Sequence, residues 1–125
     1  MTGAASSSKA GPVGPYTPVV EANGWIVVSG QVGIVDGKLA DGGFEGQCVQ
    51  ALTNLRGQLE SVGASMGDVV KTTVFLRHMT DYPRMNELYC AAFDDHRPAR
   101  SAIGVAELPL GALVEVEAWA TRVRD

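Results

Sequence analysis

Hydrophobic and polar residues follow two different periods along this chain of 125 residues. Near the N-terminal end, two short segments rich in apolar and β-branched residues, 18–22 and 25–29, lie on either side of Asn23-Gly24. This pattern predicts two antiparallel strands joined by a tight hairpin turn. Asp36-Gly37 predicts a second hairpin turn, since this pair also accepts the positive φ angles that such turns need.

Two segments carry the helical period. In the first, apolar residues recur four and three positions apart and end before Gly63, which predicts a helix with one apolar stripe. The stripe consists of Cys48, Leu52, Leu55, Leu59 and Val62. It spans only about two heptads, so it favours a helix packed on a sheet over a coiled coil. A second helix is predicted over residues 80–95, with Thr80 as its N-cap, Asp81 near its positive end and Pro83 in its first turn.

A period of two appears at residues 68–77 and predicts a strand with both faces at least partly covered. One face carries Val70, Thr72, Val74 and Leu76, and the other carries Lys71, Thr73, Phe75 and Arg77. Residues 99–105 and 113–123 predict the last two strands, with a loop at residues 108–111 between them. Three strands, a helix, a strand, a helix and two strands predict an α+β domain whose helices cover one face of a sheet.

The composition narrows the class of protein. A length of 125 residues predicts a single domain at residues 11–125, preceded by a flexible leader at residues 1–10. Hydrophobic residues make up 46% and charged residues 19%, which is far from the composition of a disordered chain. A net charge of -4 with scattered basic residues does not favour nucleic-acid binding. Without an apolar segment typical of secretion signals or membrane spans, we expect a soluble, cytoplasmic protein.

Cysteine and histidine residues add little chemistry to this picture. Cys48 and Cys90 fall within the two predicted helices, where we expect buried thiols that behave as small hydrophobic side chains. His78 and His96 have no second ligand at the spacing of a zinc site. The sequence therefore predicts no disulfide and no metal site.

Arg100 and Glu115 are the strongest candidates for chemistry. Arg100 follows Pro98-Ala99 at the start of a predicted strand, fifteen residues before Glu115. Its planar, permanently charged guanidinium can bind a carboxylate through two parallel hydrogen bonds. The alternative is a surface ion pair, which contributes little. Glu115 and Glu117 lie two apart on one strand and share a face, where they are either an acid–base pair or part of a solvated outer surface.

Several other short motifs accompany these residues. They are Gly14-Pro15-Tyr16, Ser29-Gly30-Gln31, Val70-Lys71-Thr72-Thr73-Val74-Phe75, and Asn86 with Tyr89 and Phe93. In this order and at these separations, the set resembles the RidA/YjgF family of imine and enamine deaminases, also known as the endoribonuclease L-PSP family. The resemblance covers residues 11–124. It implies a chorismate-mutase-like fold, with a six-stranded mixed sheet and two helices on one face, assembled as a homotrimer with clefts between subunits.

The resemblance also implies roles for individual residues. Arg100 would clamp a substrate carboxylate, Glu115 would hold the attacking water, and Tyr16 would shape the pocket. The residues implied to line the cleft near the substrate are Ser29, Gly30, Asn86 and Ala102. Many relatives carry cysteine at the position of Ala102, so here a backbone carbonyl, without a thiol, would contact the water or the amine. Glu117 receives no role.

The function that the resemblance implies is hydrolytic deamination of reactive enamines and imines. The substrates would be of the 2-iminopropanoate and 2-iminobutanoate type, the products 2-keto acids and ammonia, and no cofactor would be needed. Two other functions stay open. One is an endoribonuclease on single-stranded RNA, against which the acidic net charge weighs. The other is a non-catalytic, chaperone-like trimer that binds metabolites. The sequence indicates neither the preferred imino acid nor the enzyme that supplies it.

Overall fold

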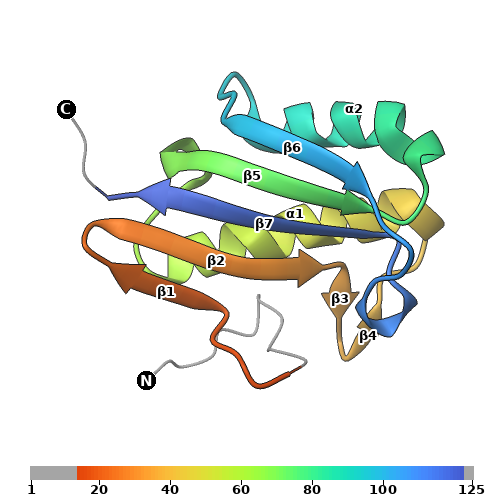
Figure 1. The fold of residues 1–125 in the computed structure, drawn as a ribbon, viewed down its shortest axis with the longest axis horizontal. Helices are drawn as coiled ribbons and strands as arrows, with labels where there is room; N and C mark the ends of the chain where they lie inside the picture. The colour runs from red at the N-terminus through yellow and green to blue at the C-terminus, as the bar shows by residue number, and fades with distance from the viewer. Residues whose placement is uncertain (1–13, 123–125) are drawn as a thin grey trace.

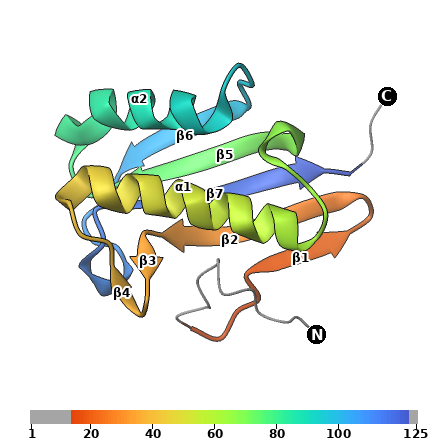
Figure 2. The ribbon, with the colours of Figure 1, turned by 180° about the vertical axis from the view of Figure 1, so that it is seen from behind.

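Two helices cover one face of a five-stranded sheet, and neither helix lies on the other face (Figures 1 and 2). The computed structural model describes residues 14–122, so the leader predicted at residues 1–10 lies outside this range. The helices are α1 (Gly43–Ser61) and α2 (Tyr82–Phe93). The strands are β1 (Val19–Ala22), β2 (Trp25–Val32), β3 (Ile34–Val35), β4 (Lys38–Leu39), β5 (Val69–Leu76), β6 (Ala99–Gly104) and β7 (Val114–Thr121).

The main sheet is mixed, with its strands in the order β1-β2-β7-β5-β6. Its β5–β6 pair is parallel and its other neighbouring pairs are antiparallel. The α+β class and the two helices on one face are confirmed, but the expected count of six strands is wrong, because β3 and β4 form a separate two-stranded sheet. The Asn54 amide on α1 donates to the carbonyls of Val32 and Ile34, both at 3.0 Å. These bonds hold the segment after β2 against α1.

Both predicted hairpin turns are confirmed. Asn23 and Gly24 have φ angles of 53° and 83°, and they join β1 to β2. Asp36 and Gly37 have φ angles of 54° and 81°, and they join β3 to β4. Two successive positive φ angles are those of a type I′ turn, whose twist matches the twist of the flanking strands.

The stripe predicted on the first helix is also confirmed. Its buried members are Cys48, Leu52, Leu55 and Leu59, and Val62 packs against them. The helix ends as predicted, since Gly63 has a φ angle of 79° and the Ala64 N–H donates to the Leu59 carbonyl at 2.9 Å. No helix within residues 14–122 is long and apolar enough to cross a membrane.

The second helix begins later than predicted. Residues Met79–Asp81 form a short 3₁₀ helix, closed by the Asp81 N–H and the His78 carbonyl at 3.0 Å, and α2 starts at Tyr82. Thr80 lies inside this turn, so its assignment as the N-cap is wrong. Asp81 occupies the N-cap position instead, and its side chain makes no capping hydrogen bond.

The start of β5 departs from the predicted alternation. Val69 is buried with 1% exposure, whereas Val70, which we expected on the core face, is 41% exposed. The pairing with β7 shifts between Val69 and Lys71, so one extra residue bulges there and exchanges the two faces. From Thr72 onward the faces are as predicted.

The two cysteines have different environments. Cys48 is buried, as predicted, and burial raises the pKa of its thiol to about 12. The prediction for Cys90 is wrong, because this thiol is exposed. The core face of α2 consists of Met85, Tyr89 and Phe93, which are four residues apart. Cys90 follows Tyr89 and is therefore turned about 100° away from that face.

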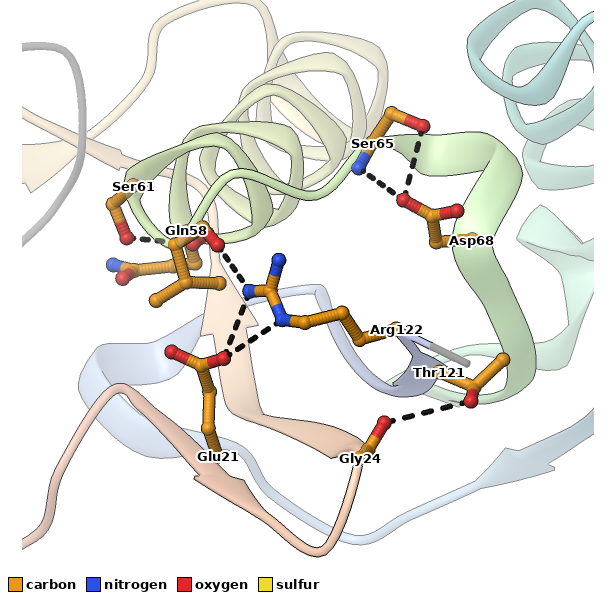
Figure 3. Close-up of polar contacts among 9 residues, drawn as sticks. Glu21, Gly24, Gln58, Ser61, Ser65, Asp68, Thr121 and Arg122 are labelled. Carbon is orange, nitrogen blue, oxygen red and sulfur yellow. Dashed lines mark hydrogen bonds and ion pairs between the residues drawn. The ribbon is translucent and has the colours of Figure 1, made fainter. Parts of the chain in front are cut away.

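Arg122 joins three elements at one end of the sheet (Figure 3). Its Nε and Nη2 donate to Glu21 Oε1 on β1 at 3.0 and 2.8 Å, and Nη2 also donates to the Val62 carbonyl at the end of α1. Its backbone N–H donates to the Gly24 carbonyl at 2.8 Å. A cation bonded to a terminal helix carbonyl also interacts favourably with the helix dipole. Arg122 thus connects the end of β7 to the first hairpin and to α1.

We expect Arg122→Ala to lower the free energy of unfolding by about 1–2 kcal/mol, because an ion pair and a charge-assisted bond to a helix carbonyl are lost together. Urea denaturation measures this change. Arg84→Ala is the matched control, since Arg84 forms exposed ion pairs with Glu45 and Glu87 at 2.8 and 2.7 Å but caps no helix. Equal losses in the two variants would contradict the capping role of Arg122.

Candidate active site

Arg100 lies on the edge strand β6 and points toward the helices. It is in register with Thr72 on β5, which is completely buried beneath them. The Arg100 Nη2 donates to the Tyr82 hydroxyl at 3.0 Å, and Nη1 lies 3.7 Å from the Met85 sulfur. The guanidinium carbon is 5.5 and 4.9 Å from the ring centroids of Tyr82 and Tyr89. Arg100 is therefore a half-buried cation that packs on aromatic rings.

Helical spacing on α2 brings these partners together. Tyr82, Met85 and Tyr89 are separated by three and four residues, so they share one face of the helix. The Tyr89 hydroxyl is hydrogen-bonded to Thr72 Oγ1 at 2.7 Å, and burial raises the pKa of this phenol. Within residues 14–122, Arg100 forms no ion pair, which argues against a simple surface ion pair. Its charge is available to an anion from outside the chain.

Asn86 lies beside this cluster, one helical turn after Tyr82. Its Oδ1 is buried and has no hydrogen-bond partner among the described residues. Buried polar atoms are rarely unpaired, and each such atom needs a structural or functional reason. Ala102 lies on the same side of β6 as Arg100, two residues further along, and packs against the core.

Glu115 lies on the opposite face of the sheet. It pairs with Phe75 on one side and Val32 on the other, and it alternates with core residues of β7. Its carboxylate is directly over Gly30, because a Cβ on Gly30 would be 1.9 Å from Glu115 Oε2. Gly30 falls where the β2–β7 pairing shifts, and the absent side chain leaves the space that the carboxylate occupies. Burial first, and then the charge of Glu117, raises the pKa of Glu115.

Ser29 precedes Gly30 on β2, and Tyr16 lies just before the residues that Ser29 contacts. The Ser29 hydroxyl donates to the Thr17 carbonyl at 2.7 Å, and its N–H donates to the Pro18 carbonyl at 2.8 Å. These bonds fasten the segment that contains Tyr16 to the bulged part of β2. Tyr16 is 42% exposed.

The residues predicted for one site thus form two groups. Arg100, Asn86 and Ala102 lie on β6 and α2, whereas Glu115, Gly30 and Ser29 lie on β7 and β2, and Tyr16 precedes the residues that are bonded to Ser29. The strand β5 separates β6 from β7, so Arg100 and Glu115 are two strand spacings, or roughly 10 Å, apart in the sheet direction and on opposite faces. One chain does not bring the two groups to a single small ligand.

Two partners of Arg100, Tyr82 and Met85, were not predicted from the sequence. Their spacing relative to Tyr89 was a usable signal, because residues four and seven positions apart share a helix face. No group of three or more His, Cys, Asp or Glu residues within residues 14–122 is arranged to hold a metal ion.

Comparison with known proteins gives consistent matches over nearly the whole chain. The sequence model of the family described as Endoribonuclease L-PSP matches residues 7–122. A mouse protein named 2-iminobutanoate/2-iminopropanoate deaminase is 43% identical over 112 residues, which cover 88% of this chain and 83% of the mouse protein.

Two solved structures are also similar. One is Escherichia coli TdcF with bound serine, at 32% identity and a TM-score of 0.89, covering 94% of this chain and 96% of TdcF. The other is RidA from the Antarctic bacterium Psychrobacter, at 33% identity and a TM-score of 0.89, covering 93% of this chain and 95% of that chain. The chain therefore belongs to the endoribonuclease L-PSP family, which is also named RidA/YjgF.

Proposed function

We propose that this protein hydrolyses 2-imino acids and their enamine tautomers to 2-keto acids and ammonia without a cofactor. The observation that carries this proposal is the Arg100 guanidinium, a half-buried cation that stacks on tyrosine rings and pairs with no carboxylate of residues 14–122. A cation in this setting suits the carboxylate of an amino-acid derivative. The relatives named 2-iminobutanoate/2-iminopropanoate deaminase support the same substrate class.

The reaction needs few groups, because an imine carbon is already electrophilic. Arg100 binds the carboxylate and orients the substrate. Glu115 accepts a proton from a water molecule as the water oxygen bonds to the imine carbon, and it passes this proton to the imine nitrogen, which gives a neutral carbinolamine. Glu115 then transfers the carbinolamine hydroxyl proton to the amine, the C–N bond breaks, and ammonia leaves as the C=O bond forms. The raised pKa of Glu115 brings this carboxyl closer to the working pH, where a general base is most effective.

The two groups of residues would meet between two chains. Arg100, Asn86 and Ala102 of one subunit would face Glu115, Gly30, Ser29 and Tyr16 of another. Two surfaces support such an assembly. The strand β6 is a sheet edge, and the helix-free face exposes Trp25 and Trp119, which are 41% and 45% exposed with ring centroids 5.8 Å apart. Following the resemblance to the RidA/YjgF family, we propose a homotrimer.

Two alternatives use the same fold. An endoribonuclease is suggested by the name of the family, but a net charge of -4 opposes binding to a polyanion. A protein that only binds metabolites is suggested by the TdcF structure with bound serine. Such a protein would bind small carboxylates through Arg100 without accelerating hydrolysis.

We expect Arg100→Ala to lower kcat/KM for imine hydrolysis on the order of 10- to 100-fold, which corresponds to the loss of one charge-assisted hydrogen-bonded contact. The assay generates 2-iminopropanoate or 2-iminobutanoate with an amino-acid oxidase and follows keto-acid release against a competing nucleophile. Arg84→Ala, on the exposed side of α2, controls for disturbance of the helix that contacts Arg100. Equal activity of Arg100→Ala and the native protein would refute the role of Arg100.

We expect two impaired variants to restore each other if the site lies between chains. Arg100→Ala and Glu115→Gln, unfolded and refolded together in equal amounts, should regain about one native site in four by random pairing around a closed ring. Each variant refolded alone should keep only its own reduced activity. No recovery in hybrids whose mixed composition is verified by native mass spectrometry would contradict the two-chain site.

We expect the fall of catalytic activity at low pH to be set by Glu115, which acts as a base only when it is deprotonated. Because burial and the charge of Glu117 raise its pKa, activity should fall with decreasing pH at a higher pH than for an ordinary carboxyl. Glu117→Gln removes one of these causes and lowers that pKa, so this fall should move to lower pH. The ratio of catalysed to uncatalysed hydrolysis is measured across the pH range, with Glu117→Asp as the charge-preserving control. A fall that does not move in Glu117→Gln would contradict this coupling.

A further inference from the structure

One side-chain oxygen of α2, the Tyr82 hydroxyl, is hydrogen-bonded to Arg100. It accepts an N–H from Arg100 Nη2 at 3.0 Å. A phenol oxygen that accepts a hydrogen bond retains its own O–H as a donor. Among residues 14–122, no acceptor takes this O–H, and Tyr82 is partly exposed. The hydroxyl is therefore able to donate to a ligand.

We propose that Tyr82 is a second donor to the substrate carboxylate, so that Arg100 and Tyr82 act as one anion-binding unit; this rests on the proposed function. The guanidinium has five N–H donors, of which Tyr82 occupies one and the Met85 sulfur weakly engages another. The remaining N–H groups and the Tyr82 O–H serve the two carboxylate oxygens. Accepting a bond from a cation polarises the phenol and strengthens its O–H as a donor.

The tyrosine rings keep this unit in place. The Arg100 guanidinium lies against the rings of Tyr82 and Tyr89, and Tyr89 is tied to the buried Thr72 by a hydrogen bond of 2.7 Å. A long side chain with many rotamers is thereby held in one orientation before the ligand arrives. Less conformational entropy is lost on binding, which raises affinity.

The neighbouring Asn86 determines the orientation of a ligand bound to the Arg100–Tyr82 unit. Its Oδ1 is buried without a partner among the described residues, one helical turn beyond Tyr82. An acceptor at this place suits the N–H group of an imine or enamine, whereas the Tyr82–Arg100 unit suits its carboxylate. The arrangement therefore favours ligands that carry an anionic end and an N–H end over simple carboxylic acids.

Tyr82→Phe tests the proposal, because it removes the hydroxyl and keeps the ring that stacks on Arg100. The KM for 2-iminobutanoate and the Kd for its hydrolysis product, 2-oxobutanoate, should each rise on the order of 10-fold or more. The kcat should change by less than about threefold, because binding is lost equally from the ground and transition states. The affinity for the neutral 2-oxobutanamide should be the same in the native protein and in the variant. Arg84→Ala should leave all of these values unchanged.

The outcomes separate this proposal from the proposed function. If the native protein fails to hydrolyse the imine, the proposed function fails, and the Kd for 2-oxobutanoate alone decides the role of Tyr82. A Kd that rises in Tyr82→Phe supports the anion-binding unit. The proposal is overturned if the Kd is unchanged, if the affinity for 2-oxobutanamide falls equally, or if the native protein does not bind 2-oxobutanoate. A melting temperature of Tyr82→Phe equal to that of the native protein confirms that both proteins in the comparison are folded.

Discussion

The architecture depends on the strict alternation of side chains along strands that are covered on one face only. In β7 the core side is formed by Val114, Val116, Ala118 and Ala120, which are all buried beneath the helices. This burial fixes the register of β7, because a shift by one residue would expose four apolar side chains and bury two carboxylates. The same alternation places Glu115 on the helix-free face. In β6 it directs Arg100 toward α2, so the core determines that the two residues are on opposite faces.

Much of this fold was predictable because its signals are local. The Asn23-Gly24 and Asp36-Gly37 turns, the stripe on α1 and the two faces of β7 follow from residues close together in sequence. The errors arose where distant contacts decide. The bulge after Val69 depends on pairing with β7, and the separate sheet of β3 and β4 depends on hydrogen bonds from Asn54. Neither is visible in a pattern of apolar and polar residues.

In the candidate site too, the residues were predictable from local motifs, whereas their arrangement in space was not. Motif resemblance selected Arg100, Asn86 and Glu115, and the geometry around each of them suits a ligand. Arg100 is a cation packed on tyrosine rings, Asn86 has an acceptor without a partner among residues 14–122, and the Glu115 carboxylate lies over Gly30. Resemblance did not indicate that one chain keeps these groups apart. It also missed Tyr82, whose spacing relative to Tyr89 indicates a shared helix face but whose contact with Arg100 is known only from the packing of α2 on β6.

The position of β7 has a consequence for how the protein is made. This strand pairs with both β2 and β5, yet it follows both of them in the sequence and is synthesised after them. Until it emerges, β2 and β5 each present an unpaired edge, and the apolar side of α1 has an incomplete surface to cover. The sheet can therefore close only once β7 has been made, after both of its partner strands. Until then a nascent chain of this topology exposes strand edges that are prone to edge-to-edge aggregation.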